Sequence, residues 1–116
     1  DMSKKVKSQS ISPAIAEIRG VRYKLTPRIL SVQEKIDFFE TICFERGERK
    51  ISAKEFYKAC IEFVEECAPK CKEFDKKISE IDLAELESAV TSILDAYRRQ
   101  RDFNRIQTLA KGLKNV

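Results

Sequence analysis

Ser52-Ala53-Lys54-Glu55 is a capping box, and the same signal recurs as SVQE at residues 31–34 and as DLAE at residues 82–85. In this motif the first side chain accepts a hydrogen bond from a free backbone N–H of the first helical turn. The glutamate three residues later reaches back to the cap. The three boxes predict three helix starts and therefore a mainly helical protein.

Apolar residues recur at helical spacing after each box, which gives each expected helix one core-facing stripe. Gly47 and Pro69 are expected to end the first two helices. A short further helix is expected between Pro69 and the third box. The predicted stripes are Val32, Ile36, Phe39 and Cys43 in the first helix; Phe56, Ala59, Cys60, Phe63 and Cys67 in the second; Cys71, Phe74 and Ile78 in the short helix; and Leu86, Val90, Ile93 and Tyr97 in the last.

A β-hairpin is predicted ahead of these helices, with Arg19-Gly20 as a two-residue turn. Gly20 can supply the positive φ that a tight hairpin turn needs. An isolated two-stranded ribbon is only marginally stable, so its apolar face must lie against the helices. That face is expected to carry Ala16, Ile18, Val21, Tyr23 and Leu25.

The expected fold class is therefore α+β, mainly α, with a small N-terminal hairpin packed on a bundle of about four helices. A length of 116 residues is enough for one hydrophobic core. We expect a disordered basic arm at residues 1–13, a single domain at 14–97 and a basic amphipathic tail at 98–116. The chain has no apolar run long enough to cross a membrane, so we expect a cytoplasmic protein.

Charge is distributed unevenly along the chain. The net charge of +4 divides into +5 for residues 1–28, −6 for residues 29–97 and +5 for residues 98–116. Basic ends of this kind can meet nucleic acid or an acidic protein partner, or they can simply keep a small protein in solution. The segment RRQR at 98–101 lies in the basic tail, but no helix-turn-helix, aromatic platform or zinc finger accompanies it.

The tail has an apolar stripe of its own, at Phe103, Ile106, Ala110 and Leu113. Propagated at ~100° per residue, this stripe lies roughly 150° away from the stripe of the last helix. Either the chain breaks near residues 98–102, or the tail offers a separate apolar surface. Both outcomes direct the stripe outward, towards a partner or a second copy of the chain.

No catalytic, metal or cofactor site is predicted. The chain has no histidine, which removes most acid–base schemes and the zinc sites that need imidazole. Its four cysteines lack the spacing of a zinc knuckle, with Cys67 and Cys71 as the only plausible pair, and free cysteine packs as a small hydrophobe. Core packing is the preferred interpretation of the cysteines, ahead of a redox role.

Several apolar residues fall beside the core stripes and are candidates for binding a partner, although contacts inside a small bundle could also explain them. Exposed aromatic residues that lie together commonly mark a protein interface. The candidates are Phe38, Ile42, Tyr57 and Ile61 in the first two helices and Phe103, Ile106 and Leu113 in the tail.

The order of these elements resembles the tail assembly chaperones of long-tailed bacteriophages. The similar features are a basic arm, the hairpin at residues 18–25, an aromatic-rich helix, a second helix with FY and FV pairs, and the segment IDLAEL at 81–86. This resemblance implies a small helical protein of the host cytoplasm, without enzymatic activity, that binds the tape-measure protein and helps recruit tail-tube subunits. The alternative function is a small nucleic-acid-binding regulator that uses the two basic ends.

Overall fold

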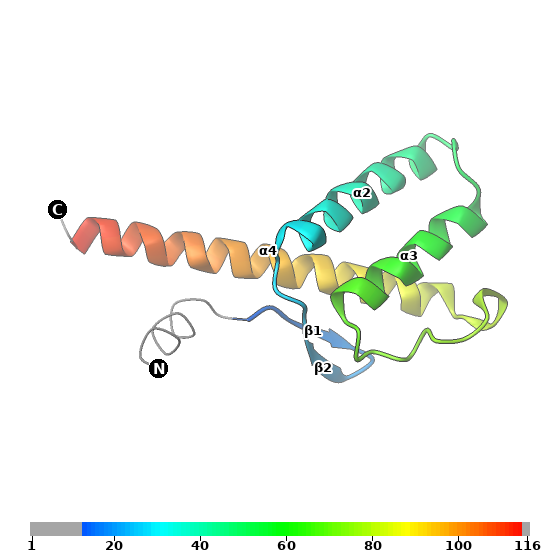
Figure 1. Ribbon diagram of the computed structural model, residues 1–116, viewed down its shortest axis with the longest axis horizontal. Coiled ribbons are helices and arrows are strands. Elements are labelled where there is room, and N and C mark those ends of the chain that lie inside the picture. The colour runs from blue at the N-terminus through cyan, green and yellow to red at the C-terminus, as the bar shows by residue number, and fades with distance from the viewer. Residues whose placement is uncertain (1–12, 115–116) are drawn as a thin grey trace.

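The computed structural model describes residues 13–114, which form a mainly helical protein with one antiparallel hairpin (Figure 1). The predicted mainly helical fold with an N-terminal hairpin is confirmed, whereas the predicted arm lies outside the described residues except for Pro13. The elements are strands β1 (Ile15–Ile18) and β2 (Val21–Lys24), helices α2 (Leu30–Gly47), α3 (Ala53–Cys67) and α4 (Leu83–Lys114), and the 3-10 turn η1 (Ile78–Glu80).

The described residues contain three α-helices rather than about four. The expected short helix between α3 and α4 is wrong: this segment consists of isolated turns, such as the one closed by Cys71 N–H on the Ala68 carbonyl, followed by η1. Cys71 and Phe74 are nevertheless buried, and Ile78 is half-buried. These few residues hold the segment against the core. The residues between them are almost all charged, so the segment has too little apolar surface to form an amphipathic helix.

The hairpin turns at the predicted two residues. Arg19 (φ 52°) and Gly20 (φ 80°) both have positive φ, which matches the right-handed twist of the flanking strands. Ile18 pairs with Val21 and Ala16 with Tyr23. β1 lies against α4, so Ala16 and Ile18 are buried. The expectation that Val21 faces the core is wrong, since β2 is the outer strand and Val21 is 48% exposed.

Two of the three predicted capping boxes begin helices. Ser52 Oγ accepts a hydrogen bond from Glu55 N–H (3.1 Å), and Asp82 Oδ1 accepts one from Ala84 N–H (2.9 Å). The box at Ser31 is wrong. The N-cap of α2 is Ile29, two residues before the predicted cap, and it makes no side-chain cap bond. The Ile29 carbonyl already accepts the first helical hydrogen bond, from Gln33 N–H. Gly47 and Pro69 end α2 and α3 as predicted.

The core lies where α3 crosses between α2 and α4, and the hairpin covers another side of α4 (Figure 1). Phe39 of α2 stacks on Phe63 of α3 with their ring centroids 4.8 Å apart. The predicted stripe of the last helix is fully buried, and Val64 of α3 joins the core although it was outside the predicted stripe.

Thr26 joins three elements at one point. Its N–H donates to the Cys67 carbonyl (2.9 Å), its hydroxyl donates to the Glu66 carbonyl (3.0 Å), and its own carbonyl accepts the Tyr97 hydroxyl (2.6 Å). The end of the hairpin is thereby fixed to the C-terminus of α3 and to the middle of α4. This junction determines where the chain enters α2.

Candidate functional site

The C-terminal half of α4 projects beyond the rest of the protein (Figure 1). α4 continues without a break from Leu83 to Lys114, so the second of the two alternatives for the tail applies: its stripe is a separate surface. Among the described residues, Tyr97 is the last buried one, and Phe103, Ile106 and Leu109 are 46%, 64% and 62% exposed. Three large apolar side chains therefore stand in solvent on a single helix.

This projecting stripe differs in one position from the predicted one. Phe103 and Ile106 lie where they were expected, while the side chain of Leu113 lies outside the described part of the protein. Leu109 was not predicted, because its neighbour Ala110 also fits helical spacing from Ile106. Both residues continue a helical stripe from Ile106, so only the larger side chain of Leu109 could have identified it as the next member of the stripe. Arg98, Arg99, Arg101 and Arg105 lie on the same half of α4 as the stripe, and all four are exposed.

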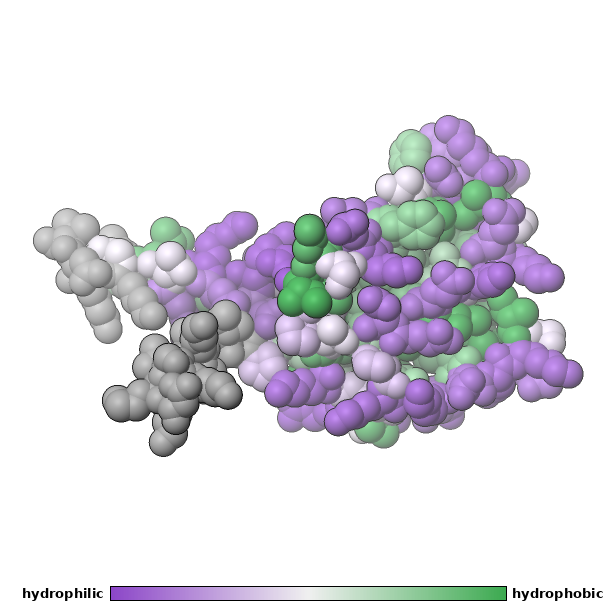
Figure 2. All heavy atoms as spheres, in the orientation of Figure 1, coloured by the Kyte–Doolittle hydropathy of each residue, from purple (hydrophilic) through white to green (hydrophobic). Residues whose placement is uncertain are grey.

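The outer face of α2 holds a second group of exposed apolar residues. Phe38 is 55% exposed, as expected for a partner-binding residue, and Ile42 is half-buried beside it. Leu30 (74%) and Phe44 (64%) were not predicted. Figure 2 shows that apolar residues on the visible face are separated by hydrophilic ones, with one apolar spot where α2 begins. No single broad apolar patch covers this view.

Tyr57 and Ile61 occupy a third place, at the edge of the core. Both are half-buried and pack against the buried residues. The hydroxyl of Tyr57 donates to Glu87 Oε1 (3.1 Å), and burial followed by this hydrogen bond raises the pKa of Tyr57. The structure thus distributes the predicted partner-binding residues over the α4 projection, the outer face of α2 and the α3 edge rather than bringing them together.

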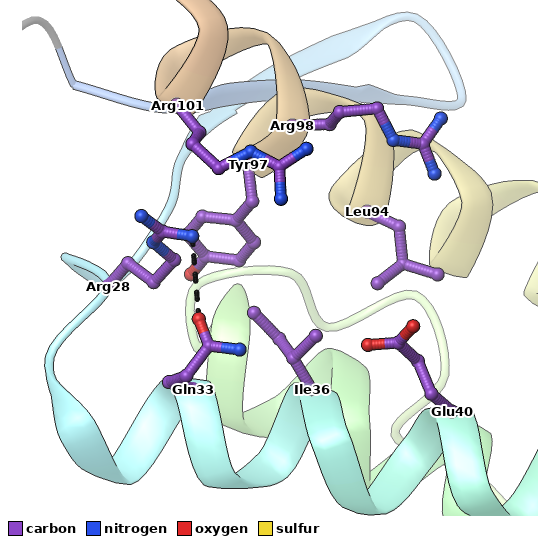
Figure 3. Close-up of a pocket in the computed structure, with 8 residues that line it drawn as sticks. All are labelled: Arg28, Gln33, Ile36, Glu40, Leu94, Tyr97, Arg98 and Arg101. Atoms are coloured by element: carbon purple, nitrogen blue, oxygen red, sulfur yellow. Dashed lines mark hydrogen bonds between the residues drawn. The ribbon is translucent and has the colours of Figure 1, made fainter. Parts of the chain in front are cut away.

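An arginine-rich cleft of about 150 Å³ lies between α2 and the middle of α4 (Figure 3). Its apolar part is formed by Ile36, Leu94 and the ring of Tyr97. Its polar part is formed by Arg28, Gln33, Glu40, Arg98 and Arg101. Three arginines against one glutamate give these lining residues a net charge of +2.

The three arginines have weak or neutral partners. Arg28 Nη1 donates to the uncharged Gln33 Oε1 at 3.4 Å. Arg98 pairs with Asp95 at 3.3 Å, and Arg101 Nε lies 3.7 Å from Asp102 Oδ1, both on the exposed surface of α4. Sequence reasoning placed Arg28 and Arg98 in different basic ends and could not join them. The bond from Tyr97 to Thr26 brings the two ends together.

Three of the four cysteines are buried, and all four thiols are free. Burial raises the pKa of Cys60 and of Cys67 to about 12, so both remain protonated at neutral pH and are poor nucleophiles. Core packing is confirmed for these two residues and for Cys71. The prediction that Cys43 belongs to the core is wrong, because the buried part of α2 ends at Phe39 and Cys43 is exposed.

Within residues 13–114, no three His, Cys, Asp or Glu side chains are grouped closely enough to hold a metal ion. No helix of this same region is both long and apolar enough to span a membrane. Compared with known proteins, the chain matches no family model, no curated protein and no solved structure.

Proposed function

We propose that this protein is a non-enzymatic assembly chaperone or adaptor that binds an apolar helical segment of another protein along the projecting half of α4. The observation that carries the proposal is the exposed row of Phe103, Ile106 and Leu109 on a helix that leaves the core behind. A helix whose apolar face is unburied within its own chain is suited to bury that face against a partner helix.

The surrounding charge adds a preference for the partner. Four arginines lie on the same half of α4 as the stripe, with Asp102 as the only acidic side chain there. An acidic, amphipathic segment would satisfy both the apolar and the charged parts of this surface. Charge complementarity of this kind mainly speeds association and selects the partner, while the buried apolar side chains supply most of the affinity.

The resemblance to tail assembly chaperones suggests that the partner is a phage tape-measure or tail-tube protein. The proposal then places this protein in the cytoplasm of the infected bacterium during tail assembly, where it would keep the partner soluble. It assigns no cofactor and no catalytic step to the chain. Self-association through the same stripe is the competing use of this surface.

Co-expression with the tape-measure protein of the same genome tests the proposal. We expect the wild-type chain to raise the soluble fraction of that protein and to co-purify with it. Replacing Phe103, Ile106 and Leu109 together by serine should weaken binding by about 2–4 kcal/mol, or roughly 30- to 1,000-fold. Phe44→Ser is the matched control, because Phe44 is as exposed as Ile106 but lies on α2.

The proposal is contradicted if the triple variant and the Phe44→Ser control solubilise the tape-measure protein equally well. Light scattering of the purified chain separates self-association from partner binding. If the wild type forms a stable oligomer and the triple variant is a monomer, the stripe binds a second copy of the chain instead.

The exposed arginines of α4 also support the alternative of nucleic-acid binding. Binding driven by phosphate contacts weakens steeply as salt rises, by about tenfold or more between low and moderate ionic strength when several phosphates are contacted. A mobility-shift titration at two salt concentrations distinguishes the alternatives, because burial of the apolar stripe against a protein depends little on salt.

A further inference from the structure

We propose that the arginine-rich cleft between α2 and α4 binds a carboxylate carried on a short aliphatic stem, such as an acidic side chain of a protein partner. The cleft lies on the body of the protein and uses none of Phe103, Ile106 and Leu109. Arg98 and Arg101 lie on the projecting half of α4 and also line the cleft, but the apolar side chains of the stripe do not, so binding in the cleft and apolar binding along the stripe can be tested separately.

Charge favours an anion in this cleft. Arg28 and Arg101 enter from different elements, and Figure 3 shows both side chains extending towards the region of Tyr97. Within the described part of the chain, Arg28 donates to the uncharged amide oxygen of Gln33, and Arg101 Nε lies 3.7 Å from the half-exposed carboxylate of Asp102. An incoming carboxylate would relieve the repulsion between guanidinium groups and could accept paired N–H bonds from them.

The apolar part of the cleft selects for a stem behind the charge. Ile36 on the α2 wall and Tyr97 on the α4 wall are buried, and Leu94 is half-buried on the α4 wall, across from Glu40 (Figure 3). A cavity of about 150 Å³ has room for the methylene groups and carboxylate of one side chain. Inorganic phosphate has no apolar part to cover these residues, and the presence of Glu40 disfavours a second negative charge.

The walls of the cleft are held in place before a ligand arrives. Tyr97 is fixed by its 2.6 Å hydrogen bond to the Thr26 carbonyl, and Arg28 follows Thr26 by only two residues. Val32, Ile36 and Phe39 anchor α2 in the core on the same side. A preformed site loses little conformational entropy on binding, which allows a small ligand to be recognised.

An NMR titration of the full chain tests the proposal, with two probes that differ only in charge. N-acetylglutamate α-amide carries the carboxylate, and N-acetylglutamine α-amide is its neutral counterpart. At pH 7 and constant ionic strength, we expect the acid to shift the Nε–Hε signals of Arg28 and Arg101 and the backbone signal of Ile36 in a saturable way. The neutral amide should cause no saturable shift.

Variants then locate the site. Arg28→Gln and Arg101→Gln should each weaken binding of the acid at least fivefold, and Leu94→Ala should weaken it at least twofold. Arg105→Gln is the matched control, because Arg105 is an exposed arginine on α4 that does not line the cleft. It should bind like the wild type, and each variant's amide spectrum reports whether the fold is retained.

Three results would overturn the assignment. Equal shifts with the neutral amide would show that charge plays no part. Equal weakening by Arg105→Gln and Arg101→Gln would show a general attraction to a basic helix. Tighter binding of inorganic phosphate than of the acid, with no effect of Leu94→Ala, would show an oxyanion site that does not recognise the stem.

Discussion

The two halves of α4 belong to one continuous helix and have opposite relations to the rest of the protein. The first half buries six side chains: Leu86, Ala89, Val90, Ile93, Ala96 and Tyr97. The second half buries none of its described side chains, although it carries Phe103, Ile106 and Leu109. Both halves carry large apolar side chains, although the first half has more of them. What distinguishes them is whether the hairpin, α2 and α3 extend far enough to cover the helix.

Leucine truncation in each half should give the largest contrast. Leu86→Ala removes a fully buried side chain and should lower the free energy of unfolding by about 2–5 kcal/mol, because the cavity cannot close completely. Leu109→Ala changes a side chain that is 62% exposed and should stay within ~0.5 kcal/mol of the wild type. Urea denaturation measures both, and similar losses for the two variants would show that the second half is buried after all.

Alkaline pH should destabilise the body through its buried thiols. The pKa of Cys60 is about 12 in the folded protein, whereas an exposed thiol in the unfolded chain ionises near pH 8.5–9. Between these values the unfolded chain binds fewer protons, so the free energy of unfolding falls as pH rises, by about 1.4 kcal/mol per pH unit for each such thiol.

Cys60→Ala should make the fall of the unfolding free energy with pH less steep between pH 9.5 and 11, by the contribution of one thiol. This change of slope is expected whatever the variant does to stability at neutral pH. Chemical denaturation at several pH values measures the slope. An unchanged slope in the variant would show that Cys60 ionises equally in both states.

Tyr97 lies at the boundary between the halves, and its hydroxyl should contribute less than a core leucine. Tyr97→Phe leaves the Thr26 carbonyl without its 2.6 Å partner and should cost about 1–2 kcal/mol. Tyr57→Phe is the control, because its hydrogen bond to Glu87 is exposed and should contribute under ~0.5 kcal/mol. In thermal melts, Tyr97→Phe should therefore have a lower midpoint temperature than Tyr57→Phe. Equal midpoints would show that the hydrogen bond from Tyr97 to Thr26 does not stabilise the fold.

Removal of the second half should change the stability of the body only slightly. A chain truncated after Tyr97 loses no buried side chain among the described residues, so its core should melt within ~1 kcal/mol of the full chain. The same truncation should abolish binding to the tape-measure protein. Unfolding of the truncated chain would instead place the projecting stripe in the core.

The features that the sequence predicts correctly are those whose cause is local. Gly20 and its neighbour set the hairpin turn, and Ser52 and Asp82 cap their helices with their own side chains. Ser31 failed as a cap because Thr26, five residues earlier, is bound to two other elements and directs the chain into α2 one residue before the box. That cause involves α3 and α4 and cannot be read from the box itself.

The candidate sites divide in the same way. Helical periodicity predicted an outward face at Phe103 and Ile106, because rotation along one helix is a local property. Helical periodicity predicted the wrong burial for Cys43, because spacing shows which face of a helix a residue lies on but not whether another element covers that position. The arginine-rich cleft was beyond sequence reasoning altogether: Arg28 and Arg101 are separated by most of the chain and meet only through the fold.

The projecting half of α4 also affects how the molecule moves through a solvent or a gel matrix. The radius of gyration of the protein is 16.8 Å and its longest extent is 54 Å, whereas a compact domain of this length has a radius of gyration of about 13 Å. The protein is therefore elongated, with higher friction than a sphere of equal mass. A single copy should elute from a sizing column ahead of its true mass, and an early peak alone would not be evidence of a dimer.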